Sequence, residues 1–564
     1  MGIIKKRFDA IVVGSGAGGA AVAWRLSSHG LRVLMLEAGP KFNPKRDYKL
    51  DQPDWERHMF PDLPGSQGQF TIDTLDLLDP EEKELRSWNR VSGITVDGNK
   101  RKPNGPGYWH VHGVGGSTLH FGGESHRIHP KAMQLRSKYS VGHDWPITYA
   151  ELEPYYTICE QLVGVAGPTK QGERWRSKPF PLPSHPLSTP AKILVAAGKE
   201  LGMHWQENSR AALSKPYNGR PACNYCANCT RGCPLGDKGS ADVTYIPKGL
   251  SSGQLILKPE CPVVRIFPEP NGRIKAINYL EGGQLQLVET PILILAAGAA
   301  QTPRLLLTNK HLSHPKGLAN SSSQVGRNLM ETLFWNSTGF LPGLNNSHMG
   351  LPTDAICWDF NAPDAIPDVS GGCRLVSSTQ EIGFTGPIAY AARAIGGFGH
   401  DLKKTVRANF GSAISVTAIG EFLPNDGTFL DLDPQKTDGF GIPLPRLHSH
   451  LEPGEIKRLR FMASKSRSLL QAAGVKHLVE EYGAWDFFST THTFGTCRMG
   501  QDPNTSVVDA NCLSHDHPNL YITDASIFPS SGGGESPSLT IQALATRAAD
   551  IIASGNALKP SVPG

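Results

Sequence analysis

The chain has 564 residues, of which 39% are hydrophobic and 19% are charged, and its formal net charge is +5. This length allows two or more domains or one large two-part enzyme, and the composition supplies enough apolar side chains for a large core. The small net charge argues against nucleic-acid binding. No apolar run reaches the roughly 18 residues that a transmembrane helix needs, so we expect no membrane span.

The first residues, Met1 to Asp9, contain no apolar signal-peptide core and no twin-arginine leader ahead of the first predicted strand. We therefore expect a cytoplasmic protein, unless a partner subunit carries it across a membrane into the periplasm. Four of the ten cysteines lie within eleven residues. That crowding differs from the even spread of cysteines in a secreted disulfide scaffold.

A strand–turn–helix–strand unit is predicted near the N-terminus. Residues 8–13 are predicted as a short buried strand, 20–29 as a helix and 32–36 as a second strand that ends at Glu37. The helix N-terminus presents free N–H groups and positive dipole to a phosphate. A carboxylate at Glu37 can accept hydrogen bonds from ribose hydroxyls.

The turn between that strand and helix has the sequence Gly-Ser-Gly-Ala-Gly-Gly over residues 14–19. Gly14 permits the tight turn, Gly16 lets a pyrophosphate approach the backbone, and Gly19 lets the helix pack against the strand. Together with the flanking elements, this turn predicts a Rossmann-like dinucleotide site. The acid that follows favours FAD or NAD and disfavours a ribose with a 2′-phosphate.

Later segments are suited to approach the same ligand. Gly115 and Gly116 can bring the backbone close to it. Residues 293–297 are predicted as a buried parallel strand that ends in small residues, which again allow close approach. Asp524 follows another apolar strand, where a polar side chain can contact the ligand.

A cysteine cluster has the spacing C-x2-C-x2-C-x3-C-P, formed by Cys223, Cys226, Cys229 and Cys233. This spacing matches the bacterial ferredoxin run, whose thiolates hold an iron–sulfur cluster. In ferredoxins the fourth cysteine serves a second cluster, so a cluster held by three of the four is the sharper hypothesis. A zinc site, free structural thiols and a disulfide remain open.

Five segments, 113–123, 293–304, 492–500, 519–526 and 540–543, resemble in order and separation the glucose–methanol–choline (GMC) oxidoreductases. The resemblance spans nearly the whole chain and is weakest in residues 335–480. The cysteine turn is most similar to those of sugar and alcohol dehydrogenases in this family.

The resemblance implies an α/β fold with two discontinuous parts. A Rossmann-like FAD-binding domain would be assembled from residues 1–50, 100–140, 216–334 and 490–564. An α+β substrate-binding domain, an antiparallel sheet with helices, would cover the flavin and comprise residues 141–215 and 335–489.

The resemblance also implies the FAD contacts. Val264 lies where the family's backbone meets adenine, and Asp524 suits the ribityl chain or the pyrophosphate. In some relatives a histidine at the position of His120 bonds covalently to the flavin ring, and both that link and simple packing beside the flavin stay open. The predicted contacts are Gly14, Gly16, Gly19, Glu37, Gly115, Gly116, Ser117, His120, Val264, Ala297, Gly298, Asp524 and Ala525.

His492 is the predicted catalytic base. In the family this histidine lies over the flavin and takes the substrate's hydroxyl proton, a role that suits a neutral imidazole with an ordinary pKa of about 6.5. The family's second residue is Asn or His, whereas Ser536 stands at that position here. A serine hydroxyl donates and accepts hydrogen bonds but is a poor base. Either His492 works with orienting help alone, or Glu535 assists, or the substrate differs from the common ones.

Three functions follow as hypotheses. The favoured one is an FAD-dependent dehydrogenase that oxidises a sugar, polyol or glycoside by hydride transfer to flavin N5. Its electrons would pass to a quinone, a cytochrome or an iron–sulfur relay, with a small or cytochrome subunit as partner. The second is an oxidase that uses O2 and makes hydrogen peroxide, on a sugar or on a sterol or long-chain alcohol. The third, motivated by Ser536, is a flavin-binding protein without alcohol oxidation.

Residues 335–480 contain alternating stretches such as 413–422 that fit sheet strands and should line the substrate cavity. Aromatic residues in and beside this region belong either to the cavity wall or to the core. They are Trp358, Phe360, Tyr390, Phe398, His400, Phe422 and Trp485.

Overall fold

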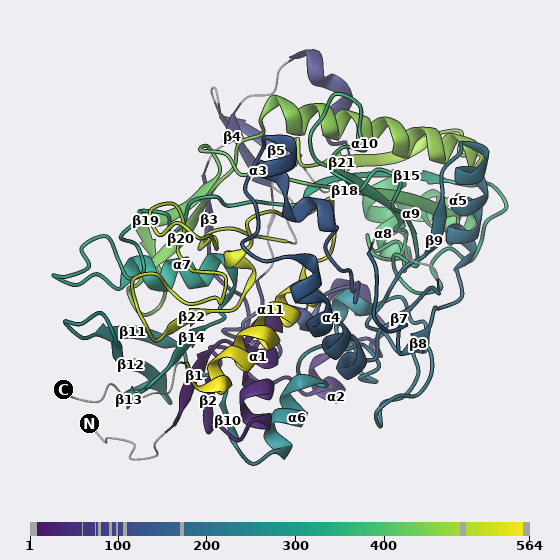
Figure 1. The fold of residues 1–564 in the computed structure, drawn as a ribbon. Coiled ribbons are helices and arrows are strands. Elements are labelled where there is room, and N and C mark those ends of the chain that lie inside the picture. Colours follow the sequence, from purple (N-terminus) through teal and green to yellow (C-terminus); the bar gives the residue numbers. More distant parts are fainter. Residues whose placement is uncertain are drawn as a thin grey trace.

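The computed structural model describes residues 8–58, 60–73, 75–76, 80–88, 93–97, 100–104, 110–169, 174–485 and 492–556. Within them a parallel and an antiparallel sheet, each with its own helices, occupy opposite sides of the molecule (Figure 1). The predicted α/β fold with a second, sheet-containing domain is thereby confirmed. The chain ends 1–7 and 557–564 and the segment 486–491, all assigned to domains from the sequence, lie outside the described residues.

A five-stranded parallel sheet forms the Rossmann-like half, in the order β10-β2-β1-β14-β22. Every residue of β1, β2, β14 and β22 is buried, which explains why these strands are continuous apolar runs in the sequence. The strands are β1 Ala10–Val13, β2 Val33–Leu36, β10 Leu255–Lys258, β14 Leu293–Leu295 and β22 Leu520–Ile522.

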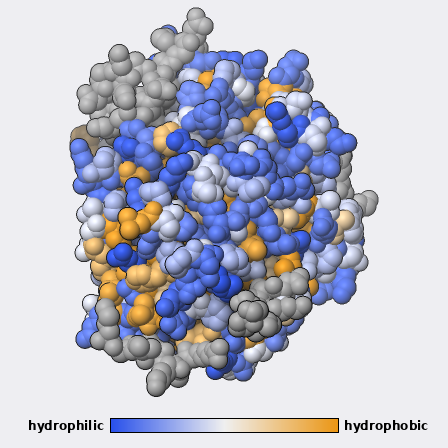
Figure 2. Space-filling model, turned by 60° about the vertical axis from the view of Figure 1, so that its left-hand side comes forward, coloured by the Kyte–Doolittle hydropathy of each residue, from blue (hydrophilic) through white to orange (hydrophobic). Residues whose placement is uncertain are grey.

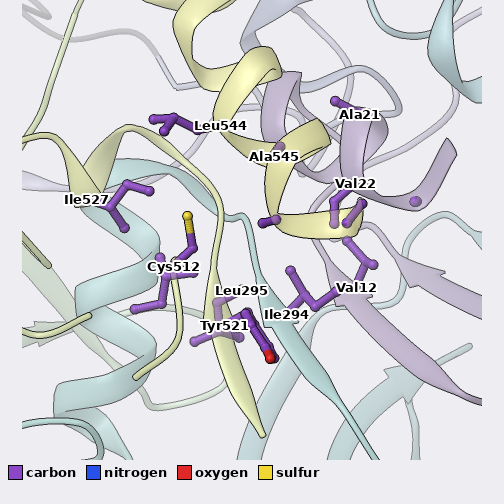
Figure 3. Close-up of a cluster of buried hydrophobic side chains, with 14 of the residues drawn as sticks. Val12, Ala21, Val22, Ile294, Leu295, Cys512, Tyr521, Ile527, Leu544 and Ala545 are labelled. Carbon is purple, nitrogen blue, oxygen red and sulfur yellow. The ribbon is translucent and has the colours of Figure 1, made fainter. Parts of the chain in front are cut away.

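Helices α1 (Ala17–Ser28) and α11 (Ser538–Ile551) pack against each other beside this sheet. Figure 3 shows Val12, Val22 and Ala545 among the side chains that fill the space between the strands and the two helices. The first helix begins at Ala17 rather than at residue 20, because the last glycines of the turn already belong to its first turn.

Helix α4 (Tyr149–Val163) starts at a capping box in which Thr148 and Glu151 exchange hydrogen bonds. The hydroxyl oxygen of Tyr156 in α4 lies 2.8 Å from the hydroxyl oxygen of Thr540 in α11. The buried apolar side chains of α4 belong to the same hydrophobic cluster as β1. The sequence placed residues 141–215 in the substrate domain. The domain division stays a prediction, and α4 packs on the dinucleotide-binding half of the molecule.

A six-stranded antiparallel sheet forms the other half, in the order β21-β15-β18-β17-β16-β9. The long helix α10 (Pro453–Ala472) covers it and packs beside α5 (Thr189–Glu200), with the buried Trp335 in the shared core (Figure 1). The strands are β9 Trp205–Glu207, β15 Leu333–Phe340, β16 Ala355–Cys357, β17 Cys373–Ser377, β18 Ala413–Gly420 and β21 Leu478–Gly483.

Smaller elements flank the two halves. Three-stranded sheets are formed by β11 (Val263–Pro268), β12 (Ile274–Glu281) and β13 (Gln284–Glu289), and by β19 (Phe429–Thr437), β20 (Pro443–His448) and β3 (Thr71–Ile72). The remaining helices include α2 Pro44–Asp47, α3 Leu135–Tyr139, α6 Tyr245–Ser251, α7 Gly298–Thr308, α8 Pro387–Ala389 and α9 Gly399–Asn409.

The surface shown in Figure 2 is mostly hydrophilic, and its hydrophobic residues form separate small groups. The 20-residue helix α10 carries lysine and arginine residues along its length. Across the part of the chain that the structure describes, no helix combines the length and apolar character needed to cross a membrane.

Candidate active site

A cavity of about 1080 Å³ lies between the two halves of the molecule. Its walls include the glycine-rich turn after β1 on one side and Phe334, Thr417 and Tyr482 of the antiparallel sheet on the other. His492 and Ser536, which are far from that turn in the sequence, line the same cavity. The fold therefore brings the predicted cofactor turn and the predicted catalytic residues to one space.

The glycine-rich turn is shaped by close backbone contacts. Gly14 has a φ of +95°, and a Cβ there would lie 2.5 Å from the carbonyl oxygen of Ala296. A Cβ on Gly19 would lie 2.0 Å from the carbonyl oxygen of Gly14. Gly18, which the sequence analysis did not single out, is just as restricted, because its Cβ would lie 1.8 Å from the carbonyl oxygen of Thr523. Only glycine lets α1 approach the strands this closely.

Gly16 faces the cavity and meets a second glycine turn. A Cβ on Gly116 would lie 2.7 Å from the Cα of Gly16. Gly115, with a φ of +110°, donates its N–H to the hydroxyl of Ser15 at 3.0 Å. Gly16, Gly116 and Ser117 line the cavity, whereas Gly115 is not among the residues of its wall.

Glu37 ties these two turns together. One carboxylate oxygen accepts from the N–H and the hydroxyl of Ser15 at 2.9 and 2.7 Å, and the other accepts from the N–H groups of Gly39 and Gly113 at 3.0 Å each. Burial raises the pKa of this carboxyl group. A carboxylate has about four acceptor positions, so a ribose hydroxyl would share an oxygen that is already bonded. Ribose binding by Glu37, which lines the cavity, stays a prediction.

Asp524 plays a similar part at the end of β22. Its carboxylate accepts from the N–H of Gly298 at 2.9 Å, from the hydroxyl of Thr302 at 2.5 Å and from the N–H of Ser526 at 2.9 Å. These bonds connect it to the first turns of α7. The other predicted contacts of this region line the cavity with it, namely Val264, Ala297, Gly298 and Ala525.

His120 lies in the cavity wall just after the second glycine turn. Its Nε2 atom is buried and has no hydrogen-bond partner among the described residues. Burial lowers its pKa to about 4, with a further lowering by Lys238. The ammonium group of Lys238 donates to the carbonyls of Leu119 and Phe121 at 2.9 and 3.0 Å, which fixes the segment. An unbonded neutral nitrogen suits either predicted role of His120 beside a flavin.

The residues present fit an FAD. The N-terminus of α1 has no side-chain cap, so its N–H groups stay available for a pyrophosphate. Gly16 and Gly116 leave room for that group, and His120 offers an unbonded nitrogen farther along the same wall. Each of these observations concerns polar or backbone atoms that a dinucleotide would contact.

His492 lies close to a buried ion pair. Burial lowers its pKa to about 4, Arg374 lowers it further, and Glu124 opposes them. The guanidinium of Arg374 donates to both carboxylate oxygens of Glu124 at 2.9 and 2.5 Å, and these contacts hold the pKa of Glu124 well below its usual range despite burial. Glu124 lines the cavity. This ion pair was not predicted from the sequence, because its two members are 250 residues apart.

Ser536 is bonded to the same carboxylate. Its hydroxyl donates to Glu124 at 2.7 Å, and its N–H donates to Nδ1 of His126 at 3.1 Å. Glu535, the other candidate helper, is absent from the cavity wall and accepts from Arg174 at 2.5 Å. Ser536 therefore lines the same cavity as His492, whereas Glu535 is bonded to Arg174 and does not line it.

The four clustered cysteines do not gather around one point. Cys226 is exposed, Cys229 is buried, and Cys223 and Cys233 are half-buried; all four are free thiols. Within the described ranges, no group of three or more His, Cys, Asp or Glu side chains is placed to hold a metal ion. The iron–sulfur prediction gains no support, and the cysteine turn instead contributes Asn228 to the cavity wall.

The sequence left two places open for the seven aromatic residues, the cavity wall and the core. None of the seven lines this cavity. The core is confirmed for Tyr390, Phe422 and Trp485, whereas Phe398 is 89% exposed. Phe334 and Tyr482, on neighbouring strands β15 and β21, take that position instead. Which face of a strand meets the cavity depends on how the two halves pack, and the sequence alone does not contain that information.

The chain is similar to known proteins over nearly its full length. The fructose dehydrogenase large subunit of Gluconobacter japonicus is 30% identical over 555 residues, covering 96% of this chain and 97% of that protein. The 6‴-hydroxyparomomycin C oxidase of Streptomyces lividus is 29% identical, covering 98% and 92%. The crystal structure of pyridoxine 4-oxidase from Mesorbium loti has the same fold, with a TM-score of 0.63, 17% identity and coverage of 97% and 99%.

The GMC oxidoreductase family profiles match two parts of the chain. The N-terminal profile matches residues 8–333 and the C-terminal profile matches residues 424–545. The matched parts contain both glycine turns, His492 and Ser536. The chain therefore belongs to the GMC oxidoreductases, FAD-dependent enzymes that act on alcohol groups.

Proposed function

We propose that this protein is an FAD-dependent dehydrogenase that oxidises an alcohol group of a sugar, polyol or glycoside to a carbonyl. The observation that carries the proposal is the single cavity shared by the phosphate-binding turn and His492. The relatives named above act, by their names, on fructose and on a hydroxyl-bearing aminoglycoside. Both substrates are polyhydroxy compounds.

His492 would serve as the base. Its depressed pKa of about 4 keeps the imidazole neutral at neutral pH, so it can accept the substrate's hydroxyl proton. FAD, when bound, supplies the hydride acceptor. Glu124 then stabilises the positive charge on His492, because the two groups attract each other in a buried site.

Ser536 would orient the substrate rather than remove its proton. Its own proton is directed to Glu124, and its oxygen accepts from the guanidinium of Arg374 at 3.4 Å. A hydroxyl oxygen has two lone pairs, so one is left to accept from the substrate. This arrangement supports a site in which Ser536 orients the substrate for His492 and no second base takes part.

The electron acceptor is part of the proposal too. We favour a quinone or a cytochrome, with a small or cytochrome subunit as partner, because one relative is named as the large subunit of a dehydrogenase. The alternative is an oxidase that uses O2, as the name of the aminoglycoside relative suggests. A cytoplasmic position, or a periplasmic one reached with a partner subunit, belongs to the same proposal and is tested by cell fractionation.

An anaerobic substrate panel tests the function directly. Flavin absorbance is followed after mixing the FAD-loaded protein with sugars, polyols, monohydroxy alcohols and sterols. Bleaching by sugars or polyols is expected, and a failure of every alcohol to bleach the flavin rejects the proposal. Peroxide formation in air then distinguishes an oxidase from a dehydrogenase.

A further inference from the structure

Two adjacent side chains in the cavity wall carry buried acceptor atoms without donors. Gln380 and Glu381 both line the cavity. The Oε1 atom of Gln380 and the Oε2 atom of Glu381 are buried, and neither has a hydrogen-bond partner among the described residues. Buried polar atoms in native proteins are nearly always bonded. Two unbonded acceptors side by side on a cavity wall therefore point to a ligand that brings donors.

The orientation of Gln380 is fixed by the rest of its amide. Its Nε2 donates to the carbonyl of Ser347 at 3.0 Å and to that of Met349 at 2.8 Å. Because both amide protons are used by carbonyls, the amide cannot be flipped, and its oxygen is left as an acceptor. The side chain is only 2% exposed.

The turn that carries both residues is rigid. It follows β17, and backbone bonds join Ile382 to Ser378, Phe384 to Thr379 and Gly383 to the carbonyl of Gln380. The two acceptors are thus held in place before any ligand arrives. Preorganisation of this kind lowers the entropic cost of binding.

Glu381 lies directly over the cofactor-binding segment. A Cβ on Gly122 would be 2.9 Å from each of its carboxylate oxygens. Gly122 follows His120 by two residues, so this carboxylate lies near the predicted flavin. Since Glu381 comes from the half of the molecule opposite the phosphate-binding turn, it is suited to hold the substrate against the flavin.

The charges around Glu381 argue against a cationic ligand. Burial raises the pKa of Glu381 and Glu124 raises it further, whereas Arg210, Lys238 and Arg374 oppose this rise and favour the charged form. The cations are already bonded elsewhere, for example Lys238 to the carbonyl of Phe121 and Arg374 to Glu124. Because three cationic side chains and one other carboxylate surround Glu381, the site disfavours an ammonium ion and favours neutral hydroxyl donors.

A lipid alcohol fits this wall poorly. An aliphatic chain or a sterol ring would cover the carboxylate of Glu381 and the amide oxygen of Gln380 without offering a donor. Such a ligand would leave these two buried acceptor atoms unbonded. The hydroxyl groups of a polyol would donate hydrogen bonds to them, and that difference favours the polyol.

We propose that Gln380 and Glu381 form a hydroxyl-binding wall that selects sugars and polyols over monohydroxy alcohols, by accepting hydrogen bonds from two hydroxyl groups near the one that is oxidised. The proposal rests on the proposed function, because it assigns the substrate class of that same cavity. It assigns no chemical step to either residue.

The test compares four probes on the FAD-loaded protein. Sorbitol and glucose are the polyhydroxy probes, and hexan-1-ol and cyclohexanol are the monohydroxy ones. The rate of anaerobic flavin reduction is measured for the wild type, Glu381→Gln, Glu381→Leu and the surface control Glu200→Gln. The flavin spectrum and the thermal midpoint verify that each variant is folded and loaded.

The wild type is expected to react faster with sorbitol or glucose than with either monohydroxy alcohol. Glu381→Gln should lower the polyol rate constant kcat/KM by roughly ten- to hundredfold, the usual effect of losing hydrogen bonds to a charged group. Glu381→Leu should lower it as well and raise the rate with hexan-1-ol. Glu200→Gln should change neither. A wild type that prefers the monohydroxy alcohols, or Glu381 variants that slow both classes equally, would overturn the proposal.

A binding measurement separates this proposal from the proposed function. Sorbitol and glucose are titrated into the FAD-loaded His492→Ala protein, with and without Glu381→Gln, and flavin absorbance reports binding. Weaker binding in the double variant supports the wall even if no alcohol reduces the flavin of the wild type, a result that would reject the proposed function alone. Equal binding in both proteins contradicts the wall.

Discussion

At the scale of single residues, the protonation of His492 is set by competing neighbours. Burial and Arg374 favour the neutral imidazole, and Glu124 favours the charged one. The imidazole is thus neutral at neutral pH, and in the proposed reaction the nearby carboxylate of Glu124 would stabilise the charge that it gains with a proton. Its environment, rather than the histidine itself, gives the site its acid–base character.

Replacing His492 with alanine should remove the base and leave the cofactor site intact. We expect FAD to stay bound and anaerobic flavin reduction by the best alcohol to slow by about 10²- to 10⁴-fold, the usual contribution of general base catalysis. Stopped-flow absorbance measures the rate, and the flavin-to-protein ratio measures loading. His204→Ala, at a side chain that is 90% exposed, is the matched control. An unchanged rate in His492→Ala would remove this residue from the mechanism.

Glu124→Gln should destabilise the protein and also slow flavin reduction by the substrate. The variant leaves the guanidinium of Arg374 buried without its carboxylate, and the side chain of Arg374 is 0% exposed. Breaking a buried pair in this way costs about 3–5 kcal/mol, so the urea midpoint should fall clearly. Asp364→Asn provides the control, since its ion pair with Lys131 has side chains 48% and 41% exposed and should contribute at most about 1 kcal/mol. Equal midpoints for the two variants would contradict the importance of the buried pair.

At the scale of elements, the contact between α1 and the loop after β22 depends on the absence of a side chain. Gly18→Ala would place its Cβ 1.8 Å from the carbonyl oxygen of Thr523, so the helix must move away from the sheet. Because α1 carries the phosphate-binding turn, we expect Gly18→Ala to lose FAD during purification and to melt at a lower temperature. The flavin-to-protein ratio and the thermal midpoint measure both effects.

Gly454→Ala is the matched control for this helix contact. Gly454 lies in the first turn of α10, and a Cβ there would meet nothing within 4 Å. Alanine has a higher helix propensity than glycine by up to about 1 kcal/mol, so this variant should be neutral or slightly stabilised. If Gly18→Ala behaved like Gly454→Ala, tight packing at α1 would not be what holds the cofactor turn.

Long elements could be predicted from local pattern. The helix predicted at 20–29 appears as α1, and the strands predicted at 293–297 and 413–422 appear as β14 and β18. Each has a strong periodicity or a continuous apolar run, which depends on the sequence nearby. The packing of α4 on the dinucleotide-binding half was not predictable in this way, since it depends on contacts with α11, hundreds of residues later.

At the scale of the whole molecule, several buried histidines make stability depend on pH. Burial lowers the pKa of His110 and His126 to about 3 and that of His112, His120 and His492 to about 4, against an ordinary value of 6.5. Between these values the unfolded chain binds protons that the folded protein does not. Each of these histidines therefore lowers the free energy of unfolding as the pH drops below about 6.5. Burial raises the pKa of Glu331 and Glu421 to about 7, and these two groups oppose that trend but are outnumbered by the histidines.

Urea unfolding between pH 7.5 and pH 5 tests this dependence. Each fully buried neutral histidine contributes a slope of up to about 1.4 kcal/mol per pH unit in that window, so the midpoint should decrease steadily toward acid. His126→Gln, where the variant is folded, should reduce the slope of the unfolding free energy against pH by the contribution of one histidine. His204→Gln, at an exposed side chain, should leave that slope unchanged. A midpoint that is constant over this range would show that the histidines become charged in the folded state.

The sequence by itself determined the dinucleotide turn, the order of the motifs and the family, because these depend on glycine geometry and on spacing along the chain. The tertiary structure decided what surrounds the chemistry. It joined Glu124 to Arg374 and Ser536, and it bonded Glu535 to Arg174 outside the cavity wall. It also excluded the seven aromatic candidates from that wall and placed Gln380 and Glu381 there. Such contacts join residues hundreds of positions apart, and only the packing of the two halves brings them together.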